Sequence, residues 1–190
     1  MKDLSSHMMD IVQNSIRAEA SWIQIRICED PEADLFLIEI QDNGCGMDEA
    51  TLARVRDPFF TSRTVRKVGL GIPLLQQNAE RTGGKVSIVS QPGQGTTLTA
   101  RFGHSHLDRP PLGDVAETLT LLAGAANPAI HFSYDHSTPS GTYRFDTQEI
   151  IQVLEGVPLG HPEILPAIQN LIRENLKEIH ADQSMSIRQS

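Results

Sequence analysis

Residues 42–47 read Asp42-Asn43-Gly44-Cys45-Gly46-Met47, directly after an apolar run at 35–41 that is typical of a β-strand. Asp-Asn-Gly is a common turn sequence, so by itself this stretch predicts only a loop at the end of a strand. Its glycines let the backbone approach another group closely, and Asp42 adds a carboxylate at that place. A binding role for this loop can therefore be inferred only together with other motifs of the chain.

Residues 3–18, upstream of this loop, have the periodicity of an amphipathic helix. Its apolar face comprises Leu4, Met8, Ile11, Val12 and Ile16. A separate polar stripe comprises Asp3, His7, Asp10, Asn14 and Arg17. Such a stripe is usually a solvated helix face, and helical geometry alone predicts no more than that.

The remaining patterns predict an alternation of short strands and helices. Strands are expected at 22–28, 35–41, 85–90 and 96–102, with a hairpin formed by 129–134 and 142–145 across a turn at 137–141. Helices are expected at 3–18, 48–55, 72–81, 114–123, 147–154 and 163–179. Residues 57–68 have no clear period and are expected to form a loop rich in cations and hydroxyls.

The composition limits the class of protein. The chain has 190 residues, enough for one domain or for one domain with a small appendage. A net charge of −8 argues against nucleic acid or an anionic membrane as a partner, because both would repel the chain. Its two cysteines fit a reducing compartment, and no apolar run spans a bilayer, so we expect a cytoplasmic protein.

Four motifs follow one another in an order that resembles the Bergerat-fold (GHKL) ATPases. This superfamily contains DNA gyrase B, a heat-shock chaperone, sensor histidine kinases and mismatch-repair ATPases. The resemblance covers about residues 1–102 and implies an α+β fold, a two-layer sandwich with helices on one face of a mixed sheet. We therefore expect an ATP-binding domain at 1–103, a linker at 104–112, and a small C-terminal α/β appendage of unknown role at 113–190.

The first motif is Asp10-Ile11-Val12-Gln13-Asn14-Ser15-Ile16-Arg17-Ala18. The resemblance implies that Asn14 ligates Mg²⁺ between the nucleotide phosphates, where an amide oxygen suits a hard cation. Arg17 lies where kinases of the family place a cation that meets phosphate. Asp10 lies where hydrolytic members carry a glutamate base, one methylene longer. Asp10 is thus a candidate base, and alternatively a helix-face acid or an outer group of the magnesium site.

The second and fourth motifs resemble those that form the adenine pocket in this superfamily. The resemblance implies that Asp42 accepts a hydrogen bond from the exocyclic amine of adenine. This contact favours ATP over GTP, because an ionised carboxylate cannot donate to the guanine carbonyl. Gly44 and Gly46 would allow the backbone to approach the base, and Met47 would pack near its plane. Thr96, in the turn Gly93-Gln94-Gly95-Thr96, would contact Asp42 or adenine directly or through water.

The third motif runs from Pro58-Phe59-Phe60-Thr61-Ser62 to Gly69-Leu70-Gly71 and resembles the lid of histidine kinases. The resemblance places Phe60 and Leu70 at the nucleotide and points the amides of Gly69 and Gly71, with the helix that follows, at the phosphates. Arg63, Arg66 and Lys67 are candidate phosphate cations, of which the sequence favours none. The expected ligands are ATP (or ADP) and Mg²⁺.

The resemblance leaves the use of the nucleotide open. One hypothesis is a histidine-kinase-like signalling protein, whose acceptor is expected in trans because the ATP-binding pattern begins too early for preceding dimerisation helices. The alternative is a nucleotide-gated regulatory ATPase or binding module without kinase activity, including an anti-sigma-like switch. The helix at 163–179 has an apolar face that is typical of core packing and that would also serve a homodimer.

Overall fold

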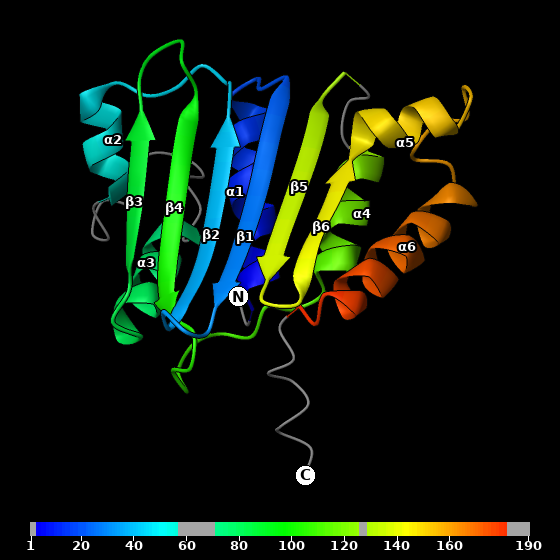
Figure 1. The fold of residues 1–190 in the computed structure, drawn as a ribbon. Helices are drawn as coiled ribbons and strands as arrows, with labels where there is room; N and C mark the ends of the chain where they lie inside the picture. The colour runs from blue at the N-terminus through cyan, green and yellow to red at the C-terminus, as the bar shows by residue number, and fades with distance from the viewer. Residues whose placement is uncertain (1–2, 57–70, 126–128, 182–190) are drawn as a thin grey trace.

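The computed structural model describes residues 3–56, 71–125 and 129–181. They form a mixed six-stranded sheet in the order β3-β4-β2-β1-β5-β6 (Figure 1). The strands are β1 (Trp22–Asp30), β2 (Leu35–Asp42), β3 (Lys85–Ser90), β4 (Thr96–Gly103), β5 (His131–Thr138) and β6 (Gly141–Asp146). Neighbouring strands are antiparallel except β1 and β5, which are parallel.

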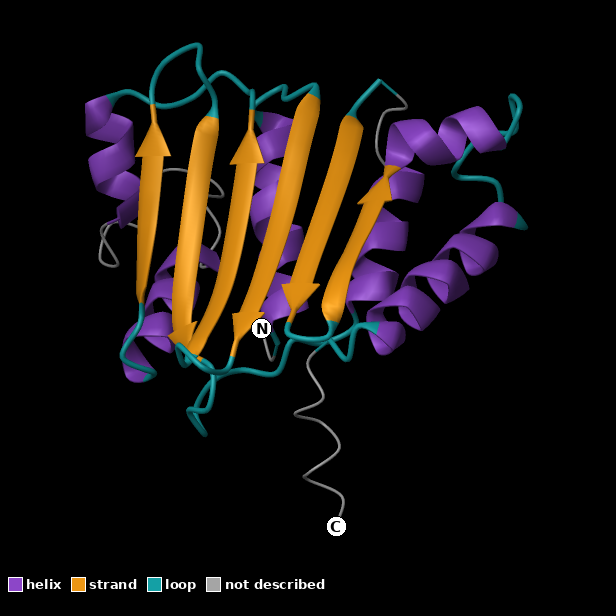
Figure 2. Ribbon diagram, viewed as in Figure 1, coloured by secondary structure: helices purple, strands orange, loops and turns teal. Residues whose placement is uncertain are grey.

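Helices cover one face of this sheet, as the resemblance implies (Figure 2). The helices are α1 (Leu4–Arg17), α2 (Glu49–Arg56), α3 (Gly71–Arg81), α4 (Val115–Ala125), α5 (Thr147–Val153) and α6 (Ile164–Glu178). α1 lies behind β1 and β2, α3 behind β3 and β4, and α4 behind β5 and β6 (Figure 1). None of these helices combines the length and the apolar character that a bilayer crossing requires, in the part of the chain that the structure describes.

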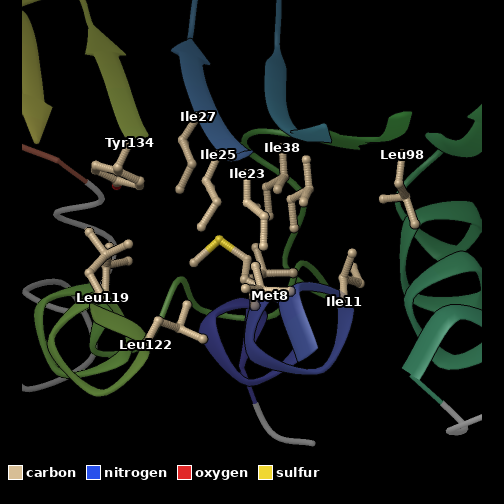
Figure 3. Packing of buried hydrophobic residues seen from close by; sticks show 14 of the residues in the cluster. Met8, Ile11, Ile23, Ile25, Ile27, Ile38, Leu98, Leu119, Leu122 and Tyr134 are labelled. Atoms are coloured by element: carbon tan, nitrogen blue, oxygen red, sulfur yellow. The ribbon is translucent and has the colours of Figure 1, made fainter. Parts of the chain in front are cut away.

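The core lies between the sheet and these helices (Figure 3). Period-two alternation points Ile23, Ile25 and Ile27 of β1 toward the helices and leaves Gln24 and Arg26 on the open face. The apolar side of α1 packs against them, with Met8 and Val12 fully buried. This confirms the two-layer α+β architecture.

The segment between β4 and α4 lies against the start of α1. The backbone N–H of Leu4 donates to the Pro111 carbonyl at 2.9 Å, and that of Ser5 donates to the Leu112 carbonyl at 2.8 Å. Asp3 caps α1 by accepting the Ser6 N–H at 2.8 Å. The stretch expected to be a linker thus satisfies amides of the first turn of α1, which have no partner within the helix.

The C-terminal hairpin extends the main sheet instead of forming a sheet of its own, because β5 pairs with β1 along residues 22–28. The predicted limits of the hairpin were wrong. The first strand was expected at 129–134 with a turn at 137–141, but β5 continues to Thr138 and the turn between the strands is only Pro139-Ser140. The second half of this strand was missed because residues 135–138 are polar and have no apolar strand pattern.

A chain of buried polar side chains joins β5 to β1. His136 is 1% exposed, and its Nε2 lies 2.8 Å from Glu29 Oε1 while its Nδ1 lies 2.7 Å from the Tyr134 hydroxyl. A neutral His136 satisfies both contacts, accepting from Tyr134 and donating to Glu29. His104, which follows β4, reaches the other oxygen of Glu29 at 3.3 Å. This network therefore ties the hairpin to the sheet beneath the described helices.

We expect Glu29→Leu to lower the free energy of unfolding by about 2–4 kcal/mol, because the buried His136 loses its acceptor. The matched control is Glu39→Leu, whose carboxylate pairs with Arg26 on the open face at 3.1 Å. Surface pairs contribute little, so the control should lose less than about 1 kcal/mol. Urea unfolding followed by circular dichroism measures both proteins, and equal losses would contradict a stabilising role for the network.

Candidate functional site

Asp42 ends β2 with its carboxylate buried, 7% exposed, among three hydrogen-bond donors. The Ser15 hydroxyl of α1 donates to Oδ2 at 2.6 Å. The backbone N–H groups of Gly44 and Thr96 donate to Oδ1 at 2.9 and 3.3 Å. Donors from α1, from the loop after β2 and from β4 therefore fix the orientation of this carboxylate.

The loop after β2 is joined to the turn between β3 and β4. The N–H of Gly93 donates to the Cys45 carbonyl at 2.8 Å, and the N–H of Met47 donates to the Ser90 hydroxyl oxygen at 2.9 Å. Gly46 has a φ of +65°, and a Cβ at this position would collide with the Gln91 carbonyl. This close approach explains why glycine occupies position 46.

The exposed side of α1 continues the site toward the start of α3. Asp10, Asn14 and Arg17 line a cavity of about 240 Å³ together with Gly71 and Ile72. Arg17 Nη1 donates to Asn14 Oδ1 at 3.0 Å. A Cβ added to Gly71 would lie 3.1 Å from Asp10 Oδ2, so α3 begins directly beside this carboxylate. The cavity thus combines an acid, an amide and a cation at the N-terminal end of a helix.

The motif residues that fall in the described ranges are connected through α1. Asp10, Asn14, Arg17 and Gly71 share the cavity, while Ser15, the neighbour of Asn14, binds Asp42. Thr96 meets Asp42 through its backbone N–H, and its hydroxyl instead lies 2.9 Å from that of Ser90. Phe60, Arg63, Arg66, Lys67, Gly69 and Leu70 lie outside the described residues.

Comparison with known proteins identifies the family of this chain. Residues 2–106 match the family described as "Histidine kinase-, DNA gyrase B-, and HSP90-like ATPase", which is more than half of the chain. The chain belongs to this family. The four motifs of this GHKL ATPase all lie within the matched residues.

Two sensor kinases are among the relatives of this GHKL ATPase. The sensor protein kinase FleS of Pseudomonas aeruginosa is 36% identical over 92 residues, which are 48% of this chain and 23% of that protein. The signal transduction histidine-protein kinase AtoS of Escherichia coli is 34% identical over 97 residues, 50% of this chain and 16% of that protein. The chain therefore spans less than a quarter of the length of either relative.

A solved structure extends the likeness of the fold beyond the matched family region. The Aquifex aeolicus MutL ATPase domain complexed with ADP superposes with a TM-score of 0.53 at 16% identity. The superposition covers 82% of this chain and 70% of the other. Because 82% exceeds the share in residues 2–106, the fold likeness of this GHKL ATPase includes part of its C-terminal region.

The donor set on α1 fits a magnesium ion that is shared with a ligand. Within the described ranges no three His, Cys, Asp or Glu side chains gather in a metal-binding cluster. Asn14 offers a single amide oxygen, which now accepts from Arg17. Mg²⁺ needs near-octahedral oxygen coordination and retains waters, so phosphate oxygens would have to supply the remaining anionic ligands.

The sequence did not predict the contacts of Ser15 and His7. Ser15 has the spacing of an ordinary helix residue, and only the tertiary structure brings its hydroxyl to Asp42. His7 was placed in a stripe typical of a solvated face, yet it is buried with 1% exposure and its ring contacts α3. That polar stripe therefore faces α3 at His7 and becomes exposed only toward Arg17.

We expect Gly46→Ala to destabilise the protein more than Gly93→Ala does. Both glycines have positive φ, so each alanine incurs about 1–2 kcal/mol of backbone strain. Only at Gly46 does the added Cβ meet backbone, and such overpacking adds about 1–3 kcal/mol. Gly93, with nothing within 4 Å of the added atom, is the matched control. Thermal and urea unfolding compare the two, and indistinguishable midpoints would contradict the tight packing of the loop.

Proposed function

We propose that the chain binds ATP with Mg²⁺ and uses it in signalling, by transferring the γ-phosphoryl group to a partner protein. The observation that carries this proposal is the 2.6 Å hydrogen bond from Ser15 to Asp42. It connects the adenine-recognition carboxylate to the helix that bears Asn14, so that one nucleotide can meet both. The sensor kinases among the relatives support a signalling role.

Asp42 would select adenine. A carboxylate only accepts hydrogen bonds when ionised, and the exocyclic amine of adenine donates them, whereas guanine presents a carbonyl oxygen there. The three protein donors at Asp42 leave acceptor capacity on the carboxylate, which has about four lone-pair sites in all. Because these donors fix the carboxylate in advance, little side-chain entropy is lost when adenine binds.

The cavity on α1 would receive the phosphates. When bound, Mg²⁺ neutralises phosphate charge and polarises the γ-phosphoryl group. Asn14 would hold the metal through its amide oxygen, which Arg17 must then release. The Arg17 guanidinium is then available to a phosphate, and the first turn of α3 presents amides with the positive end of the helix dipole.

In the proposed transfer, the bond between the γ-phosphorus and the oxygen bridging to the β-phosphate breaks, and ADP leaves with that oxygen. A new bond joins the phosphorus to a nucleophilic side chain of the partner, whose proton passes to a base. Asp10 is the candidate base, since its carboxylate lines the cavity beside Gly71.

A second candidate function is a nucleotide-gated ATPase, in which water replaces the partner as nucleophile. The carboxylate of Asp10 beside the start of α3 and the fold likeness to a MutL ATPase domain favour it. The same base would then take a proton from water, and inorganic phosphate would be released. The two functions thus differ in the acceptor and share the site.

We expect Asp42→Asn to weaken ATP binding by about 10- to 100-fold, because a charge-assisted hydrogen bond to adenine is lost. The fold should persist, since the Ser15 hydroxyl can accept from the new amide as readily as it donates. Asp48→Asn is the matched control, because Asp48 is exposed and caps α2 through the Thr51 N–H at 2.7 Å, as asparagine also does. Calorimetry measures both variants, and unchanged affinity of Asp42→Asn would count against the adenine assignment.

The fate of the γ-phosphate separates the two functions. With γ-labelled ATP, we expect the wild-type chain to label a co-purified partner, and Asp10→Asn to reduce that labelling by about 10²-fold or more. Asn14→Ala, which removes the metal ligand, should abolish labelling. If Asp10→Asn abolishes release of free phosphate and no protein is labelled, the ATPase function holds instead. If neither label nor phosphate appears, the site is a binding module only.

A further inference from the structure

His7 is the fourth residue of α1, and its ring is turned away from solvent, 1% exposed. Its Nδ1 lies 3.2 Å from the carbonyl oxygen of Gly71, the first residue of α3. Its Nε2 lies 3.3 Å from the side-chain amide nitrogen of Asn78, two turns further along α3. One imidazole therefore contacts α3 at two separate places.

These two contacts select one tautomer. The Gly71 carbonyl can only accept, so Nδ1 carries the proton and donates to it. The Asn78 amide nitrogen can only donate, so Nε2 is the acceptor, as a neutral imidazole requires. Burial lowers the pKa of His7 despite the nearby Asp10 and Asp3 carboxylates, which keeps the ring neutral at neutral pH.

His7 makes both of the hydrogen bonds that connect α1 to α3 in the described part of the chain. The Gly71 carbonyl belongs to the same residue that packs against Asp10 and lines the cavity with Asn14. This imidazole therefore holds the Gly71 carbonyl beside the cavity that α1 lines. The Asp42 carboxylate is held by other groups, namely Ser15, Gly44 and Thr96.

We propose that His7 is a positioning residue for the phosphates of the bound nucleotide, acting by fixing the Gly71 carbonyl and thus the start of α3. This proposal rests on the proposed nucleotide binding. It requires that the Nδ1 contact to Gly71 matters for phosphate affinity, that the Nε2 contact to Asn78 matters less, and that recognition of adenine is independent of both.

Two amide substitutions separate the contacts. The side-chain nitrogen of asparagine occupies about the position of histidine Nδ1, and that of glutamine about the position of Nε2. His7→Asn therefore retains the donor to Gly71, whereas His7→Gln loses it and retains only a group near Asn78. Asn78→Ala, which leaves the Gly71 contact in place, is the matched control on the partner side, and His7→Leu is a second variant without a donor in case His7→Gln does not fold.

Calorimetry with ATP·Mg²⁺ and with adenosine tests the proposal. We expect His7→Gln and His7→Leu to bind ATP about tenfold more weakly and adenosine unchanged, since one positioned hydrogen bond is lost. His7→Asn and Asn78→Ala should bind both ligands within about twofold of wild type, by the same conversion. Equal losses for ATP and adenosine, or equal losses in His7→Asn and His7→Gln, would overturn the proposal, because either result indicates general destabilisation.

Amide hydrogen exchange of the nucleotide-free protein tests the structural part separately. Exchange in the second turn of α3, whose amides are the first with acceptors inside the helix, should accelerate in His7→Gln and not in His7→Asn. If the wild type binds no ATP while this exchange pattern holds, the proposed function fails and the contact between His7 and Gly71 stands. If ATP binds and the exchange pattern is absent, the positioning role of His7 is refuted.

Discussion

The candidate site depends on one buried carboxylate that must be satisfied from three directions. An ionised side chain at the end of a β-strand is costly to desolvate unless donors surround it. Asp42 obtains them from α1, from its own loop and from the facing residue of β4. These hydrogen bonds join α1 to the end of β2 and agree with the register of β2 against β4, in which Asp42 pairs with Thr96. The same contacts that stabilise the carboxylate therefore also determine where Asn14 lies, one residue before Ser15.

The C-terminal strands make β1 an interior strand of the sheet instead of an edge strand. Without them β1 would be an edge strand with a row of unpaired backbone groups, which favours non-native pairing. Parallel pairing with β5 covers that edge, and the antiparallel β6 then becomes the outer strand. Parallel pairs are slightly less stable per residue than antiparallel ones. The buried contact of His136 with Glu29 adds a polar tie between β5 and β1.

The sequence predicted most elements because their periodicity is strong and their ends carry turn residues. The isoleucines of β1 and the apolar face of α1 left little ambiguity. It failed where polar side chains are buried against partners distant in the chain. His136 lies beyond the predicted end of its strand, and its buried partner Glu29 is 107 positions away in the chain. His7 reads as surface for the same reason, since its partners lie 64 and 71 positions further on. Periodicity shows only whether a side chain is polar. Buried polar pairs also depend on which distant segment of the chain packs beside that side chain.

The two halves of the site are held by different kinds of interaction. The Asp42 side is part of the sheet, since β2 and β4 align Asp42 with Thr96 and a side-chain hydrogen bond attaches α1 to it. The cavity side depends on packing between two helices, α1 and α3, and the hydrogen bonds between them among the described residues come from one imidazole. Helix pairs can shift by sliding at little cost, whereas a strand register changes only by whole residues. Under the proposed function, the sheet would fix the adenine-binding half in advance, whereas the geometry of the phosphate-binding half would depend on how α3 packs against α1 and on the His7 ring that joins them.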